Sequence, residues 1–282
     1  MFFISEVSSN HSQDISRALE FIDQSASAGC DAVKFQLFKV EELFSKEVFT
    51  SKPETANRKE WELPLEFLPK LAKRCQLRGI QFSCTPFYID AVKELEDYVD
   101  FYKIASYELL WDDLISACAK TGKPLILSTG MATMNEVQNA VNVAFKNGCT
   151  DLTLLHCTSA YPTPYEEANL AAIETLRTSF DCKVGWSDHT VNPGVIHRAV
   201  NHWGAEVIEF HMDLEGAGEE FESGHCWLPG QIAPIIEQLH HGIAADGSGI
   251  KEPAASEMSD RMWRTDPLDG LRPMKLIRGT LK

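Results

Sequence analysis

Two histidines, His189 and His211, lie at or just beyond the ends of two successive β-forming runs. If those runs are neighbouring strands of a parallel sheet, both imidazoles can face one point and bind a transition metal, with positions left open for substrate and water. We therefore expect them to hold one divalent ion that acts as a Lewis acid. Glu209 shares a strand face with His211 by the two-residue period, so it can orient that imidazole or bind the ion directly.

Two lysines provide positive charge near the ends of other β-forming runs. Lys34 and Lys103 lie within such runs, and hydroxyl groups occur at Ser106, Ser128 and Ser187. Ammonium groups and oriented hydroxyls can replace the hydration shell of an anion. This set predicts a small dianionic substrate that carries phosphate or carboxylate groups.

The β-forming runs recur eight times, and each is followed by a segment of helical period. They cover residues 2–7, 32–37, 80–85, 99–104, 124–128, 152–157, 183–187 and 207–211. Strict alternation predicts a parallel sheet with helices outside, and eight such units close into a barrel. We expect an α/β fold, a single-domain (β/α)8 TIM barrel. An open doubly wound sheet is the alternative, but the turn at residues 8–11 lacks the glycine-rich phosphate motif typical of it.

The helical segments carry their own signals. Apolar residues at Ile15, Leu19, Ile22 and Ala26 share one helix face, and residues 133–136 form a capping box of Thr133 and Glu136 ahead of another apolar stripe. Residues 1–250 are predicted to form the barrel, and residues 251–282 a C-terminal extension packed on or over it. The polar connection 38–64 is long enough to be a lid or binding loop, or else a solvated excursion.

Polar residues stand at the end of every predicted strand, where barrel enzymes place their active sites. They are Glu6 with Asn10 and His11, Lys34 with Gln36, Ser83 with Thr85, Lys103 with Ser106 and Glu108, Ser128 with Thr129, Thr158 with Ser159 and Tyr161, Ser187 with Asp188 and His189, and Glu209 with His211. Each alone has an ordinary structural explanation, such as a capping serine or a snorkelling lysine. Together they predict an active site, with Glu108 as a candidate general base.

Composition excludes some classes of partner. The formal net charge is −15 and no cluster of Lys and Arg occurs, which argues against nucleic acid as a ligand. The N-terminus has no basic region and no apolar run is long enough to cross a bilayer, so we expect a cytoplasmic protein without membrane contact. The eight cysteines are scattered singly without a CxxC pair, which indicates reduced thiols.

Ordered sequence blocks at these same positions resemble the sialic acid synthase family, whose members condense phosphoenolpyruvate with an open-chain amino sugar. The blocks are Asn10-His11, Lys34-Phe35-Gln36, Thr85-Pro86-Phe87, the segment from Lys103 to Glu108, the segment from Leu127 to Met131, the segment from His156 to Pro162, the segment from Ser187 to Thr190, and Glu209-Phe210-His211. The resemblance extends from Glu6 to about Glu257.

The resemblance implies a role for each matched residue. His189 and His211 would bind a divalent metal, typically manganese, with magnesium or cobalt as alternatives, and the metal would polarise the sugar aldehyde. Five residues would hold phosphoenolpyruvate: Lys34, Lys103, Ser106, Ser128 and Ser187. Glu108 would activate the attacking water, with Glu6 and Lys103 as the other catalytic residues. The remaining pocket residues would be Gln36, Thr85, Ser159 and Tyr161.

Two departures from the family pattern concern the acceptor sugar. Family members usually carry Gly-Pro-Asp after the second metal histidine, whereas residues 219–223 here read Glu-Glu-Phe-Glu-Ser, with Glu222 in the place of the aspartate. Family members also continue into an antifreeze-like domain that covers the partner subunit's active site, and this sequence ends at Lys282 without one. The tail from Asp260 could replace part of that cap. A homodimer through barrel contacts and a separate capping partner both stay open.

Two other functions compete with the synthase. A metal-dependent aldolase or other lyase of the same fold would use the two histidines without phosphoenolpyruvate, but it leaves the lysine and serine set unexplained. A non-catalytic sugar-binding barrel is compatible with the missing cap. The presence of both histidines and Glu108 argues against it.

Overall fold

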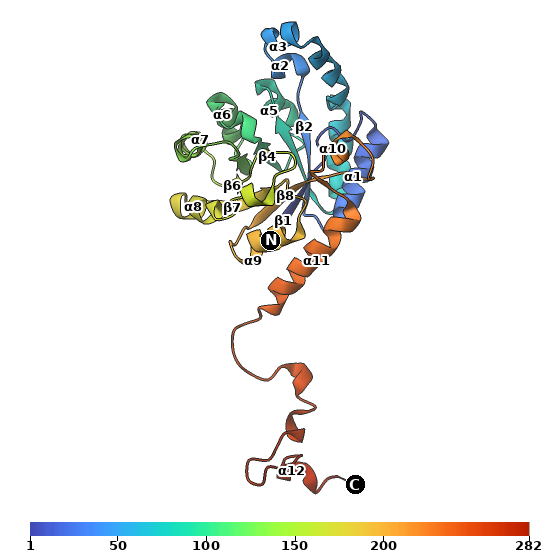
Figure 1. Ribbon diagram of the computed structural model, residues 1–282, viewed down its shortest axis with the longest axis vertical. Coiled ribbons are helices and arrows are strands. Elements are labelled where there is room, and N and C mark those ends of the chain that lie inside the picture. Colours follow the sequence, from blue (N-terminus) through green and yellow to red (C-terminus); the bar gives the residue numbers. More distant parts are fainter. Residues whose placement is uncertain (282) are drawn as a thin grey trace. The chain divides into compact units, whose positions relative to one another are not determined.

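Nine parallel strands follow one another in the order of the sequence, and β1 also pairs with β8, which closes the first eight into a barrel. The computed structural model describes residues 1–281 (Figure 1). The strands are β1 (Phe2–Glu6), β2 (Ala32–Leu37), β3 (Gln81–Pro86), β4 (Phe101–Ile104), β5 (Leu125–Ser128), β6 (Leu152–His156), β7 (Lys183–Asp188), β8 (Val207–Met212) and β9 (Cys226–Trp227). The predicted (β/α)8 barrel is confirmed, and each predicted strand agrees with an observed one to within two residues.

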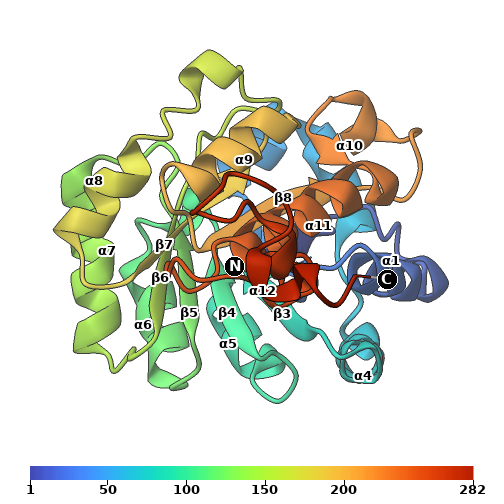
Figure 2. The ribbon, with the colours of Figure 1, turned by 90° about the horizontal axis from the view of Figure 1, so that it is seen from below.

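Helices surround the strands, as Figure 2 shows along the barrel. Each of the first eight strands is followed by one main helix: α1 (Ile15–Ser27), α4 (Leu68–Arg78), α5 (Ile89–Leu95), α6 (Asp112–Lys120), α7 (Met134–Lys146), α8 (Ala172–Ser179), α9 (Pro193–Asn201) and α11 (Pro229–Ala245). Short elements fill the longer connections: α2 (Val40–Leu43), α3 (Lys46–Ser51), and the 3-10 helices η1 (Pro53–Trp61), η2 (Leu65–Phe67), η3 (Ser106–Glu108) and η4 (Tyr165–Glu167). One turn of helix, α10 (Glu219–Glu222), precedes β9.

The start of α7 shows how local sequence fixes an element. Thr133 accepts a hydrogen bond from the Glu136 backbone N–H at 3.4 Å, and the Glu136 carboxylate accepts one from the Thr133 N–H at 2.6 Å. The capping box is therefore present as predicted, and it satisfies two N–H groups that the first turn leaves free. The apolar stripe that follows is buried against the barrel at Val137, Ala140, Val141 and Ala144.

The barrel interior has an apolar layer and a charged layer. Inward-facing side chains at the starts of the strands form a small cluster of Ile4, Ala32, Phe101, Ile126, Leu155 and Val207. Two residues further along the strands, the same inward-facing positions are Glu6, Lys34, Lys103, Ser128 and Glu209. Strand alternation therefore places these charged side chains at one end of the barrel, next to the apolar layer. The larger core lies between strands and helices.

The residues from Gly242 onward form a second compact unit. Within it, the buried Asp266 carboxylate accepts hydrogen bonds from the backbone N–H groups of Leu268 at 3.0 Å and Lys275 at 2.7 Å. Its short helices are η5 (Ala255–Glu257), η6 (Arg261–Trp263) and α12 (Lys275–Arg278). The barrel unit ends at His241. The boundary at residue 250 and the packing of the tail on or over the barrel stay predictions.

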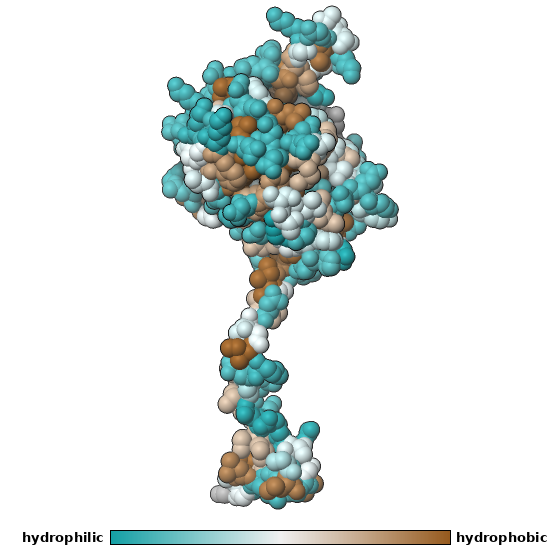
Figure 3. All heavy atoms as spheres, turned by 90° about the vertical axis from the view of Figure 1, so that its left-hand side faces the viewer, coloured by the Kyte–Doolittle hydropathy of each residue, from teal (hydrophilic) through white to brown (hydrophobic). Residues whose placement is uncertain are grey.

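The face drawn in Figure 3 is mainly hydrophilic on the barrel. Across residues 1–281, no helix is long and apolar enough to cross a membrane. All eight cysteines are free, and only Cys182 among them is not fully buried.

Candidate functional site

A cavity of about 1010 Å³ opens at the carboxyl ends of the strands, where barrel chemistry is expected. Most of the residues predicted from the sequence line it: Glu6, Lys34, Gln36, Lys103, Ser106, Ser128, Tyr161, Ser187, His189 and His211. Glu108, Thr85, Ser159 and Glu222 do not line this cavity. The volume is large enough for two small substrates together.

The floor of the cavity is a buried network of two ammonium and two carboxylate groups. Lys34 pairs with Glu6, and its Nζ lies 3.2 Å from the Thr85 hydroxyl and 3.9 Å from Glu209 Oε1. Lys103 donates to the same Glu209 oxygen at 3.1 Å. Thr85 thus lies behind the cavity wall and orients Lys34 rather than facing the open space.

Opposite charges set the protonation of this network. Burial alone would lower the pKa of Lys34, but Glu209 and Glu6 outweigh burial and raise it. Burial alone would raise the pKa of Glu209, and the ammonium groups of Lys103 and Lys34 instead lower it to about 2. Lys34 and Glu209 are therefore held in their charged forms, and an anionic ligand could take the place of a carboxylate partner of Lys34.

A small group of serine hydroxyls, called the cradle below, follows β4, β5 and β6 around Gly130. The Gly130 N–H donates to the Ser106 hydroxyl at 3.0 Å, and the hydroxyls of Ser128 and Ser159 are buried without a hydrogen-bond partner. A Cβ atom on Gly130 would lie 2.2 Å from Ser159 Oγ and 2.8 Å from Ser106 Oγ, so only glycine leaves this space open. Unpartnered buried hydroxyls are costly, and an anion would satisfy them.

Glu108 ends the short helix η3, directly after β4. Burial raises the pKa of Glu108 to about 7, although the nearby Lys103 opposes the rise, and Oε2 is buried without a hydrogen-bond partner. A carboxyl that titrates near neutral pH suits a general base.

The two predicted metal ligands lie together, with ring centroids 5.4 Å apart. His189 Nδ1 lies 2.9 Å from the Thr158 carbonyl oxygen, which can only accept, so Nδ1 carries the proton and Nε2 keeps its lone pair. Burial and the neighbouring His211 lower the pKa of His189 to about 3. The ring is therefore neutral, which is the form that binds a metal.

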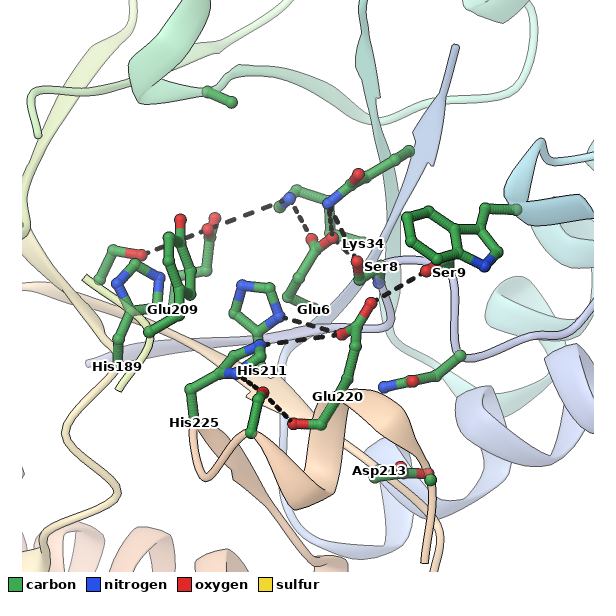
Figure 4. A pocket seen from close by; sticks show the side chains of 18 of the residues that line it. Glu6, Ser8, Ser9, Lys34, His189, Glu209, His211, Asp213, Glu220 and His225 are labelled. Atoms are coloured by element: carbon green, nitrogen blue, oxygen red, sulfur yellow. Dashed lines mark hydrogen bonds and ion pairs between the residues drawn. The ribbon is translucent and has the colours of Figure 1, made fainter. Parts of the chain in front are cut away.

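A second group of donors, not predicted from the sequence, adjoins His211. The ring centroid of His225 lies 4.8 Å from that of His211 (Figure 4). Potential ligand atoms of His211, Glu220, His225 and Cys226 all lie within 4.8 Å of one another. His211 Nδ1 and Glu220 Oε2 are buried without hydrogen-bond partners, so this donor set fits a divalent metal ion.

Part of the long connection after β2 reaches the cavity. Arg58, Glu60 and Trp61 of η1 line it, and the Arg58 guanidinium lies 5.2 Å from the Trp61 ring centroid. The β2–α4 connection therefore forms part of the wall, which agrees with a binding loop rather than a solvated excursion.

Comparison with known proteins places the chain in a family. The NeuB family profile matches residues 21–251. This chain belongs to the NeuB family. N,N'-diacetyllegionaminic acid synthase of Campylobacter jejuni is 33% identical over 91% of this chain and 80% of that protein. Pseudaminic acid synthase of Helicobacter pylori is 36% identical over 86% of this chain and 75% of that protein.

A solved structure supports the same assignment. The crystal structure of N-acetylneuraminic acid synthetase from Leptospira borgpetersenii, in complex with citrate, matches with a TM-score of 0.81 and 33% identity over 92% of this chain and 89% of that one. The resemblance to the sialic acid synthase family is confirmed, and with it the expectation of a synthase rather than a non-catalytic barrel.

In this NeuB family chain, the structure does not bring the predicted Glu222 to the cavity. Glu222 is exposed, whereas Glu220 lines the wall. Residues two apart on a helical turn point in nearly opposite directions, so α10 can present only one of them. Comparison with the family's Gly-Pro-Asp stretch, in which Glu222 takes the place of the aspartate, had suggested Glu222. The signal for the other group was His225 itself, a histidine close after the eighth predicted strand.

Proposed function

We propose that this chain condenses phosphoenolpyruvate with an open-chain aldose, giving a nonulosonic acid and phosphate. The observation that carries this proposal is the buried floor of Lys34 and Lys103 beside the unpartnered hydroxyl of Ser128, at the base of a cavity whose wall holds the neutral imidazole of His189. Such a floor suits an anion with two charged groups, and the space above it suits an uncharged acceptor.

Phosphoenolpyruvate would take the place of carboxylates on the lysines. Its phosphate and carboxylate would accept from Lys34 and Lys103, and hydroxyl donors would come from Ser106, Ser128 and Ser187. Glu6 also accepts from Gln36 Nε2 at 2.7 Å, so it keeps a partner when Lys34 turns to the ligand. The exchange leaves Glu6 hydrogen-bonded to Gln36 and pairs both ammonium groups with the ligand.

The reaction forms one bond between carbons and breaks one between carbon and oxygen. C3 of phosphoenolpyruvate attacks the aldehyde carbon, whose oxygen becomes a hydroxyl, and C2 becomes an oxocarbenium centre. Glu108 takes a proton from the water that attacks C2, and phosphate then leaves with cleavage of its bond to C2 as the C2 hydroxyl becomes the keto group. The two protons of the water end on the new hydroxyl and on the departing phosphate. Glu209, held ionised between the lysines, keeps the floor balanced when phosphate departs.

A divalent metal ion would supply Lewis-acid polarisation of the aldehyde oxygen, and manganese, magnesium and cobalt are all candidates. His189 and His211 would hold it, and the Tyr161 ring lies beside both, at centroid distances of 4.2 and 5.8 Å. The double variant His189→Ala/His211→Ala is expected to lose both bound metal and turnover. Full metal occupancy in that variant would refute the assignment.

The identity of the acceptor sugar is the more specific part of the proposal. Gln36, Tyr161 and the η1 residue Arg58 line the upper cavity, where an N-acetylmannosamine-like aldose would bind. A panel of free and phosphorylated aldoses, assayed for phosphate release, tests the choice. A homodimer, a separate capping partner and a cytoplasmic location stay predictions.

A metal-dependent aldolase is the second candidate, because the histidine group alone would serve it. It would cleave or form its product without releasing phosphate from phosphoenolpyruvate. The same phosphate assay therefore separates the two functions.

A further inference from the structure

The turn that follows β7 is folded around one carboxylate. β7 ends at Asp188, directly before His189. Asp188 Oδ1 accepts from the backbone N–H of Thr190 at 3.2 Å and from the Thr190 hydroxyl at 2.7 Å. Asp188 Oδ2 accepts from the backbone N–H of Val191 at 3.2 Å. The two residues that follow His189 are therefore both bound to the side chain that precedes it.

Val191 has a backbone conformation that its side chain disfavours. Its φ is +48°, in the left-handed region, which a β-branched residue rarely adopts. Such a conformation persists only where the surrounding structure holds it, and it occurs most often near functional sites. The N–H group of this residue is the one that Asp188 Oδ2 binds. The carboxylate thus stabilises a strained turn beside His189.

The same carboxylate also bonds to two tryptophans on different strands. Ser187 lines the cavity, so strand alternation points Asp188 outward between strands and helices, where it is fully buried. There Oδ1 accepts from Trp186 Nε1 at 3.2 Å, and Oδ2 accepts from Trp227 Nε1 at 3.0 Å. Trp227 belongs to β9. One side chain therefore joins the turn after β7 to the strand that ends the segment after β8.

Two other bonds hold His189, and Asp188 completes them. The ring Nδ1 lies 2.9 Å from the Thr158 carbonyl oxygen, and the His189 carbonyl accepts from the Thr163 N–H at 2.9 Å. These bonds fix the ring and the peptide of His189 against the loop after β6. The chain beyond His189 is fixed by Asp188, which is not among the residues that line the cavity.

We propose that Asp188 is a positioning residue for metal binding, which holds His189 through the turn at Thr190 and Val191 and steadies the segment after β8 through Trp227. This inference rests on the proposed function, which gives His189 and His211 the metal. A loosened turn would spread the His189 imidazole over several positions, so metal affinity would fall. The lysines that would bind phosphoenolpyruvate belong to β2 and β4 and would keep their places.

Manganese binding by Asp188→Asn is the first test. The amide keeps one acceptor oxygen, and its NH2 group would face the N–H donors of Val191 and Trp227. We expect manganese affinity to fall by about tenfold or more in calorimetry, with phosphoenolpyruvate affinity within about threefold of wild type.

Asp31→Asn separates positioning from general stability. Asp31 Oδ2 likewise accepts from a strand N–H, that of Phe3 at 2.8 Å, but at the end of the barrel opposite the cavity. This variant should lose stability in denaturant unfolding and keep the manganese affinity of wild type. An equal loss of manganese affinity in both variants, or no loss in Asp188→Asn, would overturn the proposal.

A milder variant covers the case in which Asp188→Asn does not fold. Thr190→Val removes only the hydroxyl bond to Asp188 and should weaken manganese binding by about threefold or more. Thr178→Val is its control, because the Thr178 hydroxyl bonds to the Glu174 carbonyl within α8. If Asp188→Asn folds, the double variant should bind manganese no more weakly than Asp188→Asn alone, since Thr190 acts through the carboxylate. Wild-type affinity in Thr190→Val would overturn the proposal.

A measurement without metal keeps this inference apart from the proposed function. The His189 Nδ1–H proton, bonded to the Thr158 carbonyl, can be followed by nitrogen-15 NMR of the full chain. Its exchange with water should be about tenfold faster in Asp188→Asn than in Asp31→Asn, because the turn opens more often. If the wild-type chain bound no manganese, the proposed function would lose its metal, and this exchange rate would still decide the role of Asp188. Equal rates in the two variants would refute that role.

Discussion

The barrel interior and the segment after β8 hold their polar side chains in opposite ways. Inside the barrel, each ammonium group already has a carboxylate partner, as Lys103 has Glu209 at 3.1 Å. In the segment after β8, Glu220 and His225 face each other at 3.9 Å without a hydrogen bond. The charges of the first region are therefore already paired, whereas Glu220 in the second region faces two imidazoles without a hydrogen bond to either. One chain thus prepares one site for an anion and another for a cation.

The two sites are also built on different kinds of secondary structure. Its residues belong to strands, whose register is fixed by ladder pairing around the closed barrel. The residues of the second site belong to a one-turn helix and a two-residue strand. A substitution inside the barrel should therefore alter the charge balance of the anion site. A substitution in the segment after β8 should instead alter metal binding, with little effect on anion binding.

The largest effect is expected at Glu108, which acts on the reaction rather than on either binding site. Glu108→Gln should lower turnover by roughly 10²–10⁴, with phosphoenolpyruvate affinity changed by about threefold at most. Steady-state kinetics and calorimetry measure the two quantities. Because the base must be ionised and its pKa is raised to about 7, wild-type turnover should increase as pH rises through about 7. Turnover equal to wild type in the variant would refute the role.

Removal of one barrel ammonium tests the anion site. Lys103→Met should weaken phosphoenolpyruvate binding by about 3 kcal/mol, through loss of a charged hydrogen bond and an unpaired Glu209. Lys34→Met should behave alike. Calorimetry decides this, with denaturant unfolding to confirm that each variant folds. Lys183→Met is the control, since Lys183 pairs with Asp151 in solvent. Unchanged affinity in both test variants would place the anion elsewhere.

The cradle beside the lysines offers a finer test. Gly130→Ala should weaken phosphoenolpyruvate binding by about tenfold or more, because the methyl group would crowd the Ser159 and Ser106 hydroxyls. Gly230→Ala is the matched control, since no atom lies within 4 Å of its added Cβ. Equal affinities for the two variants, again by calorimetry, would show that the cradle is not used.

The smallest effect separates two neighbouring carboxylates of α10. Glu222→Gln should leave manganese affinity within about twofold of wild type, whereas Glu220→Gln should reduce it about tenfold or more. The reason is that Glu222 is exposed and Glu220 lines the cavity. A loss of metal in Glu222→Gln as large as that in Glu220→Gln would restore the sequence-based choice.

Periodicity was a good guide wherever backbone geometry is regular. The inward-facing positions of β1, β2, β4, β5 and β8 follow from two-residue alternation, so Glu6, Lys34 and Lys103 could be placed together from the sequence. The first helix was harder. Its buried face includes Ser25, which bonds to the Ser5 hydroxyl at 2.6 Å, while Ile15 and Leu19 are only partly buried. A polar residue that is buried because it bonds to one specific partner cannot be recognised from the hydrophobic pattern of the sequence.

The directions of side chains in irregular segments could not be predicted from hydrophobic periodicity. The direction of Glu220 depends on the one-turn helix α10, and that of His225 on the left-handed turn at Gly224. Neither conformation is encoded by a repeat. The burial that raises the pKa of Glu108 likewise depends on long-range packing, although its place after the fourth strand was predictable.

The most direct test of the account is phosphate release from phosphoenolpyruvate by the purified full chain. With manganese and a panel of free and phosphorylated aldoses, including N-acetylmannosamine, we expect release only when both the metal and a suitable aldose are present. Omission of either should reduce release to the uncatalysed level, because the floor binds the anion and the reaction needs the polarised aldehyde. Absence of release with every aldose, while phosphoenolpyruvate and manganese both bind, would contradict the proposed condensation.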